Sequence, residues 1–143
     1  MKRTAVIAVA ASICLAFVGG SAGAAKKRAE QCYVEVHTNL YGNAAVPCEY
    51  RFTMLVNPDG TISSSAGGTR FCEGSGFIGL GAGAGTVGTP SSILFPNIAD
   101  VTFDLPAKRD EGSWVLGLVR SLSDRGGASP VTSSQMICSE APR

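Results

Sequence analysis

The stretch CEYRFTMLVNPDG, residues 48–60, decides the fold that the sequence predicts. Its residues alternate between apolar and polar as far as Met54, which is the period of a strand with one buried face. The turn NPDG, residues 57–60, follows at once, with a proline that presets φ and a glycine that accepts a left-handed backbone. A second strand is expected from Thr61, so the stretch predicts an antiparallel hairpin.

Similar patterns recur along the chain, in CYVEVH (32–37) and ADVTFDL (99–105). SWVLGLVRS (113–121) is apolar on both faces, which predicts a central strand with Trp114 in the core. Further short strands are expected at residues 61–66, 69–72, 92–95 and 134–138. The sequence therefore predicts an all-β chain, a single antiparallel β-sandwich or small barrel of about 7–9 strands stapled by two disulfides.

The N-terminus has the features of a secretory signal peptide. Lys2 and Arg3 precede an apolar run, and Ala22-Gly23-Ala24 fits a cleavage site. We expect cleavage of residues 1–24, a basic N-terminal tail at 25–31 and a single β domain at 32–143. An uncleaved membrane anchor is the alternative, and either reading predicts a secreted or periplasmic protein.

Cysteine usage fits export. Once Cys14 is removed with the signal peptide, an even number of cysteines is left for an oxidising compartment. The hairpin about residues 57–60 brings Cys48 opposite roughly residue 70, and Gly67-Gly68 could absorb the extra residues as a bulge. This geometry favours two disulfides among the alternatives that four cysteines allow, namely Cys48–Cys72 and Cys32–Cys138. The wide spacing of the cysteines predicts neither a metal site nor a cofactor.

The polar side of two predicted strands carries the candidate catalytic residues. Opposed residues of an antiparallel pair share a face, so the simplest register places Glu35 across from Arg51 and His37 across from Glu49, with Tyr33 beside them. A carboxylate base, an imidazole acid and a guanidinium could together cleave RNA. The same residues also match ordinary cross-strand ion pairing, and this is the reading we favour, on which none of them is catalytic.

The segment GFIGLGAGAGTVG, residues 76–88, overlaps matches to the G-x-G-x-x-G pattern of nucleotide-binding loops. Pro90 and Pro96 interrupt the helix that such a loop requires, so nucleotide binding is rejected. As a strand, the segment presents a face of glycines that could pack inside the domain, remain a loop or meet another molecule. In the last case, the expected interaction residues are Phe77, Ile78, Leu80, Gly81, Gly83 and Gly85.

These features predict an exported, non-catalytic β-domain that binds a protein or another ligand, such as an inhibitor of a secreted hydrolase. Two alternatives remain open: a structural subunit, assembled as an oligomer through the glycine-rich strand, and a small hydrolase or ribonuclease that uses the His37 face. The net charge of +1 does not favour a nucleic-acid partner. Membrane contact is expected only through an uncleaved N-terminus or the glycine-rich segment.

Overall fold

The computed structural model describes residues 28–106 and 115–142, so the expected signal peptide and Trp114 lie outside the described residues. The prediction of an antiparallel all-β fold is confirmed, but the expected count of about 7–9 strands is too low. Within the described residues the elements are β1 (Glu30–Asn39), the 3-10 helix η1 (Leu40–Gly42), β2 (Pro47–Val56), β3 (Thr61–Ser64), β4 (Thr69–Cys72), β5 (Gly76–Gly79), β6 (Gly83–Thr86), β7 (Ser91–Phe95), β8 (Ala99–Asp104), β9 (Val115–Leu116), β10 (Leu118–Asp124), β11 (Gly127–Ala128) and β12 (Val131–Glu140). Because β1 begins at Glu30, the last residues of the expected tail belong to a strand.

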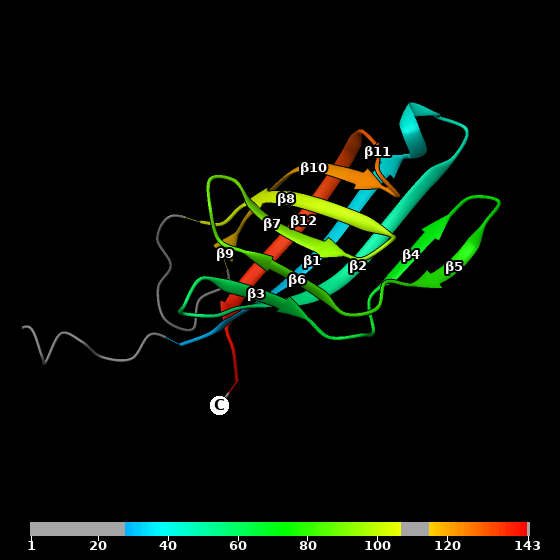
Figure 1. Cartoon of the computed structure of the whole chain (residues 1–143). Helices are drawn as coiled ribbons and strands as arrows, with labels where there is room; N and C mark the ends of the chain where they lie inside the picture. The colour runs from blue at the N-terminus through cyan, green and yellow to red at the C-terminus, as the bar shows by residue number, and fades with distance from the viewer. Residues whose placement is uncertain (1–27, 107–114, 143) are drawn as a thin grey trace, which may run out of the picture.

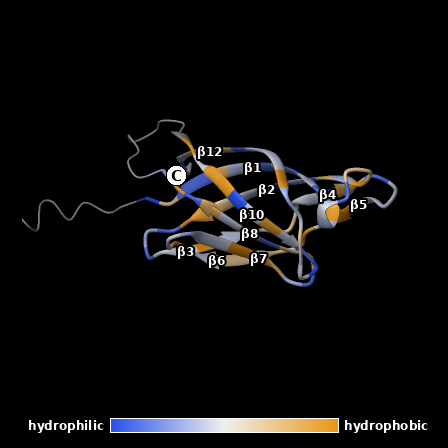
Figure 2. Cartoon of the chain, turned by 90° about the horizontal axis from the view of Figure 1, so that it is seen from above, coloured by the Kyte–Doolittle hydropathy of each residue, from blue (hydrophilic) through white to orange (hydrophobic). Residues whose placement is uncertain are grey.

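The strands form two layers. The long strands β12, β1 and β2 lie behind β10, β8, β7, β6 and β3, and the arm formed by β4 and β5 extends to one side (Figures 1 and 2). The strand order is β11-β10-β8-β7-β6-β3-β2-β1-β12-β9, and β4 connects β2 to β5. Among the described residues the sheet does not close into a barrel by strand pairing, although residues 115–124 pair first with β12 and then with β8.

The core lies between these layers, and the predicted alternation determines which side chains enter it. Phe52 of β2 packs edge-on against Phe95 of β7, with ring centroids 4.8 Å apart. This contact joins the two layers. Other fully buried side chains on both sides of it include Val34, Val36, Met54, Ile93, Val101, Phe103, Leu122 and Met136.

Both predicted disulfides are present, and each joins residues that are directly opposed in a ladder. Cys32–Cys138 links β1 to β12, and Cys48–Cys72 links β2 to β4. Strands β3 and β4 both pair with β2, and residues 65–68 connect them and take up the shift in register between the two ladders, as expected for the Gly67-Gly68 pair. A side chain at Gly68 would lie 2.9 Å from the Arg51 carbonyl oxygen, so this approach requires glycine.

The expectation that residues 113–121 form a strand buried on both faces is wrong for its described part. Leu116 and Leu118 are 71% and 56% exposed, whereas Val119 and Leu122 point into the core. The reason is the change of partner strand at Gly117. The Gly117 N–H donates to the Met136 carbonyl oxygen at 3.0 Å, and the outer side of this chain segment has no covering layer among the described residues.

A buried ion pair adds a polar link between the layers. Arg70 of β4 donates from Nε and Nη2 to the Asp124 carboxylate, over 2.6 and 3.2 Å, and the Tyr50 hydroxyl donates to the same carboxylate. Burial, reinforced by the hydrogen bond to Asp124, raises the pKa of Tyr50 well above its ordinary value. Burial is the largest single influence on the pKa of Arg70 and lowers it, but the hydrogen bonds and charge interactions with Asp124 and Tyr50 together outweigh burial, so the pKa is raised.

We expect Asp124→Asn to lower the free energy of unfolding by about 3 kcal/mol or more, because it leaves the Arg70 charge buried without a counter-charge. The control is Asp104→Asn, which breaks the exposed pair with Arg120. That change is expected to lower the free energy by about 1 kcal/mol at most. Urea unfolding of both variants measures the difference, and equal losses would contradict a structural role for the buried pair.

The glycine-rich segment forms two short strands separated by residues 80–82, not one continuous strand. β6 is paired on one side with β3 and on the other with β7. A Cβ atom at Gly85 would lie 1.9 Å from the Ser92 carbonyl oxygen. In β6 the missing side chains therefore serve close packing inside the domain.

Gly85→Ala should lower the free energy of unfolding by about 1–3 kcal/mol, because the new methyl group overlaps the backbone of β7. The matched control is Gly79→Ala in β5, where the added Cβ meets no atom within 4 Å and the backbone is not left-handed. Denaturant unfolding compares the two variants. A Gly85→Ala protein as stable as Gly79→Ala would show that β6 does not pack this closely.

Candidate functional site

The candidate site is the side of strands β5, β4, β2, β1 and β12 that points away from the core. We call this side the outer face. Alternation turns the odd-numbered residues of these strands away from the core, except Val131 of β12, which lies beyond a register shift and packs against the core. The strand registers arrange them in rows across the sheet. One row is Phe77, Phe71, Glu49, His37 and Ser133, and the next is Gly79, Thr69, Arg51, Glu35 and Gln135.

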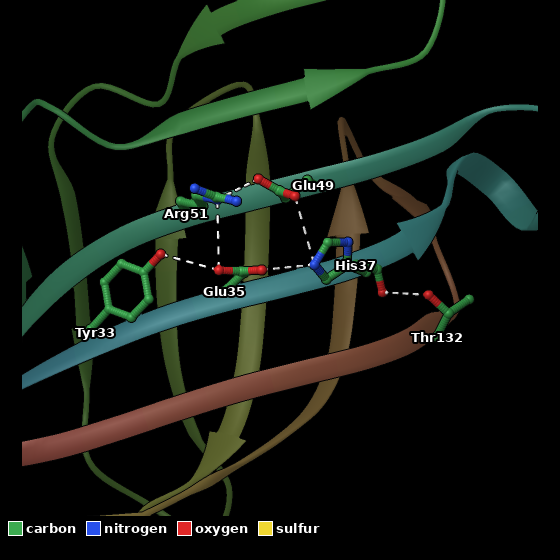
Figure 3. Close-up of polar contacts among 6 residues, drawn as sticks. All are labelled: Tyr33, Glu35, His37, Glu49, Arg51 and Thr132. Carbon is green, nitrogen blue, oxygen red and sulfur yellow. Dashed lines mark hydrogen bonds and ion pairs between the residues drawn. The ribbon is translucent and has the colours of Figure 1, made fainter. Parts of the chain in front are cut away.

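The centre of the outer face holds a polar cluster, defined as Tyr33, Glu35, His37, Glu49 and Arg51 (Figure 3). The predicted register is confirmed, because Glu35 lies opposite Arg51 and His37 opposite Glu49. The structure thus brings all four candidate catalytic residues together. Since every member lies on β1 or β2, two adjacent ladder strands position the whole cluster.

The contacts in the cluster divide the carboxylate oxygens into two sets. Glu35 Oε1 lies 2.9 Å from His37 Nε2, and Glu49 Oε2 lies 3.7 Å from the same nitrogen. The other oxygen of each carboxylate is near the Arg51 Nε atom, at 3.6 Å for Glu35 Oε2. The Tyr33 hydroxyl also donates to Glu35 Oε2, over 3.2 Å. One oxygen of each glutamate therefore points at the imidazole, and the other is held by neighbouring donors.

These contacts stabilise the charged forms of two groups. The hydrogen bond with His37 is the largest cause that lowers the pKa of Glu35; burial opposes it, and Tyr33 and Arg51 add to it. The bond to Glu49 raises the pKa of Arg51. Burial and the bond to Glu35 raise the pKa of Tyr33. At neutral pH the cluster thus holds a carboxylate and a guanidinium in fixed positions next to an imidazole.

The backbone at His37 is tied to the third strand of the layer. The Thr132 hydroxyl of β12 donates to the His37 carbonyl oxygen over 3.0 Å (Figure 3). The register between β1 and β12 shifts immediately after His37. Bulges of this kind often redirect a side chain next to a functional site. Sequence patterning gave no signal for this irregularity.

The arm formed by β4 and β5 places two aromatic rings beside the polar cluster. Phe71 and Phe77 are directly opposed, with ring centroids 4.7 Å apart, and Phe77 is 73% exposed. Sequence reasoning selected Phe77 but missed Phe71. The signal was available, because both phenylalanines lie at equal distances from the turn at residues 73–75.

The other expected interaction residues occupy different environments. Leu80 and Gly83 are buried, and Gly85 packs against β7. Gly81 has a φ of +73° in the connection between β5 and β6, and Ile78 is half-buried opposite Arg70. Of the expected set, Phe77 is the one large apolar side chain that lies exposed on the outer face.

A separate shallow depression of about 580 Å³ lies between the β7–β8 and β10–β11 turns and shares no residue with the polar cluster. Its lining is Asn97, Ile98, Ala99, Asp100, Ser123, Arg125 and Gly126. Within residues 28–106 and 115–142, no helix has the length and apolar character needed to cross a bilayer. Comparison with protein-family models, with curated proteins and with solved structures finds no match for the chain.

Replacing Glu35 by glutamine should produce a pH-dependent loss of stability. The folded-state pKa of Glu35 is lowered, so its carboxylate stabilises the fold above the unfolded-state pKa. This contribution is lost as the pH falls through the folded-state value. The difference in unfolding free energy between wild type and Glu35→Gln should therefore be larger at about pH 6 than at about pH 3.

The control for this comparison is Thr53→Ala, which changes an outward residue of β2 that does not titrate. Its difference from wild type should be nearly the same at both pH values. Urea unfolding at each pH gives the two differences. If the Glu35→Gln difference is equally independent of pH, the polar cluster does not stabilise the Glu35 carboxylate.

Proposed function

We propose that this chain is an exported binding module that recognises a protein partner through the outer face, with Phe77 as its anchor. The observation that carries the proposal is the exposure of the Phe77 ring, at 73%, on an arm that extends beyond the two layers (Figure 2). An exposed phenylalanine on a rigid strand gains free energy when a partner removes it from water.

The surroundings of Phe77 resemble the arrangement of a protein interface. Such interfaces place aromatic and arginine side chains centrally and a polar, hydrogen-bonding rim around them. Here Phe71 supports the Phe77 ring, and Glu49 is the next outward residue in the same row. Arg51 lies on β2 as well, and Tyr33 and His37 lie on the neighbouring strand β1. Their mutual contacts hold them in place before a partner arrives, which lowers the entropic cost of binding.

The backbone of the arm offers a second means of recognition. Among the described strands, β5 pairs with β4 alone, so its other edge has free N–H and C=O groups. Its sequence GFIG carries no charge that would repel an added strand. A partner segment could add to this edge by backbone hydrogen bonds while a pocket receives Phe77.

Export is part of the proposal. The two disulfides fit an oxidising environment, and the N-terminal sequence has the composition of a signal peptide. A partner would then be met outside the cytoplasm. Inhibition of a secreted hydrolase is one activity that such a module could have.

A photo-crosslinking amino acid at position 77 tests the proposal. In the native host, position 77 should give a discrete crosslinked species with another protein. The matched control is the same probe at Leu94, which is 51% exposed on β7 in the other layer. Crosslinking at 77 that is absent at 94, and abolished by adding Phe71→Ala, is the expected result. Equal crosslinking at both positions, or none, would contradict recognition through this arm.

The two alternatives from the sequence give different outcomes. Crosslinks between copies of the chain would favour a structural subunit. Cleavage of RNA or another substrate by the purified protein, lost in His37→Gln, would favour a hydrolase. Either result would replace the binding proposal.

A further inference from the structure

We propose that Glu35, His37 and Glu49 form a zinc-binding site on the outer face. This inference does not rest on the protein partner proposed above, because zinc binding by the polar cluster requires neither Phe77 nor a bound partner. It also goes beyond the sequence, in which the wide spacing of the cysteines argued against a metal.

The three residues supply one nitrogen and two oxygens that converge. One donor atom from each of them lies within 4.8 Å of the other two. Two of the residues are separated by one position on β1, and the third lies directly across on β2. This spacing places three side chains on one face at the corners of a triangle. A small movement of the side chains would bring all three donors to one ion.

The remaining contacts orient the donors without occupying them. Arg51 and Tyr33 contact Glu35 Oε2, and Arg51 contacts Glu49 Oε1. The oxygens nearest His37 Nε2 are the opposite pair, Glu35 Oε1 and Glu49 Oε2. Carboxylates that bind metals are held in this way by a second layer of hydrogen bonds. The guanidinium therefore need not leave for an ion to enter.

The charge of the cluster suits a divalent cation. Two carboxylates and one guanidinium leave one negative charge when the imidazole is neutral. The neighbouring outward residues add no charge, since Ser133 and Gln135 lie on β12 and Thr69 and Phe71 on β4. A proton on His37 Nε2 would occupy the position that the ion needs, so zinc and the proton compete.

The donor types favour zinc over the alkaline-earth ions. Imidazole nitrogen with carboxylate oxygens is a common zinc ligand set, whereas Mg²⁺ and Ca²⁺ prefer oxygen ligands alone. The side chains of Glu35, His37 and Glu49 are 23%, 40% and 28% exposed, which leaves the ion a route of entry. Three protein ligands would leave a fourth position for water or for a group from another molecule.

The test uses the disulfide-bonded protein without a polyhistidine tag, titrated with zinc chloride. His37 is the only histidine of the chain, so one imidazole signal in a long-range ¹H–¹⁵N spectrum reports the site directly. We expect the Nε2 resonance to shift on addition of one equivalent of zinc, with no shift from magnesium. Calorimetry should give one site whose affinity falls as the pH is lowered, because protons compete with the metal for its ligands.

Variants connect this binding to the three residues. His37→Gln should abolish zinc binding, and Glu35→Gln or Glu49→Gln should each weaken it about tenfold or more. Asp104→Asn removes a carboxylate from the other layer and should leave the affinity unchanged. Circular dichroism and the unfolding transition confirm that each variant is folded. The proposal is overturned if millimolar zinc leaves the His37 resonance in place, or if folded His37→Gln binds zinc as wild type does.

Discussion

The register of four neighbouring strands is the constraint on which the rest of the structure depends. Each disulfide joins directly opposed residues, β1 to β12 and β2 to β4, while β1 and β2 pair along their whole length. A slip of one residue would move every side chain to the opposite face. Cys32 and Cys48 are buried, so the covalent links also determine which residues point outward. The core and the outer face are thus two consequences of the same alignment.

This alignment explains why the candidate site lies on strands and not on loops. The members of the polar cluster alternate with fully buried residues such as Val34, Val36 and Tyr50. The buried side chains hold the backbone, and the backbone holds the polar groups that project from it. On this rigid base, contacts between neighbouring side chains can assign each carboxylate oxygen a separate partner. A surface loop would have to order itself before it could present such an arrangement.

Much of this could be predicted from the sequence, because alternation and turn residues are local signals. Residues 48–72 indicated the hairpin and the disulfide to Cys72, and the alternation of residues 32–37 against residues 48–56 indicated the partner of Glu35. What could not be predicted depends on tertiary contacts. No local pattern shows that Gly85 faces the backbone of β7, that Leu116 stays exposed, or that Arg70 meets Asp124. The sequence also could not show which carboxylate oxygen of Glu35 and Glu49 faces Arg51 and which faces His37. A strand register predicts which residues are neighbours, but it does not predict how their side chains are oriented.

The buried Arg70–Asp124 pair and the exposed polar cluster differ most clearly in how far water can reach their charges. Arg70 and Asp124 are 5% and 0% exposed, so water and ligands cannot reach them, and their interaction connects the layers. The polar cluster uses the same chemical groups at 23% to 52% exposure, where they stay open to a partner, a proton or an ion. Exposed pairs contribute little to stability. The polar cluster is therefore expected to add little to folding, which is consistent with the binding roles proposed for it.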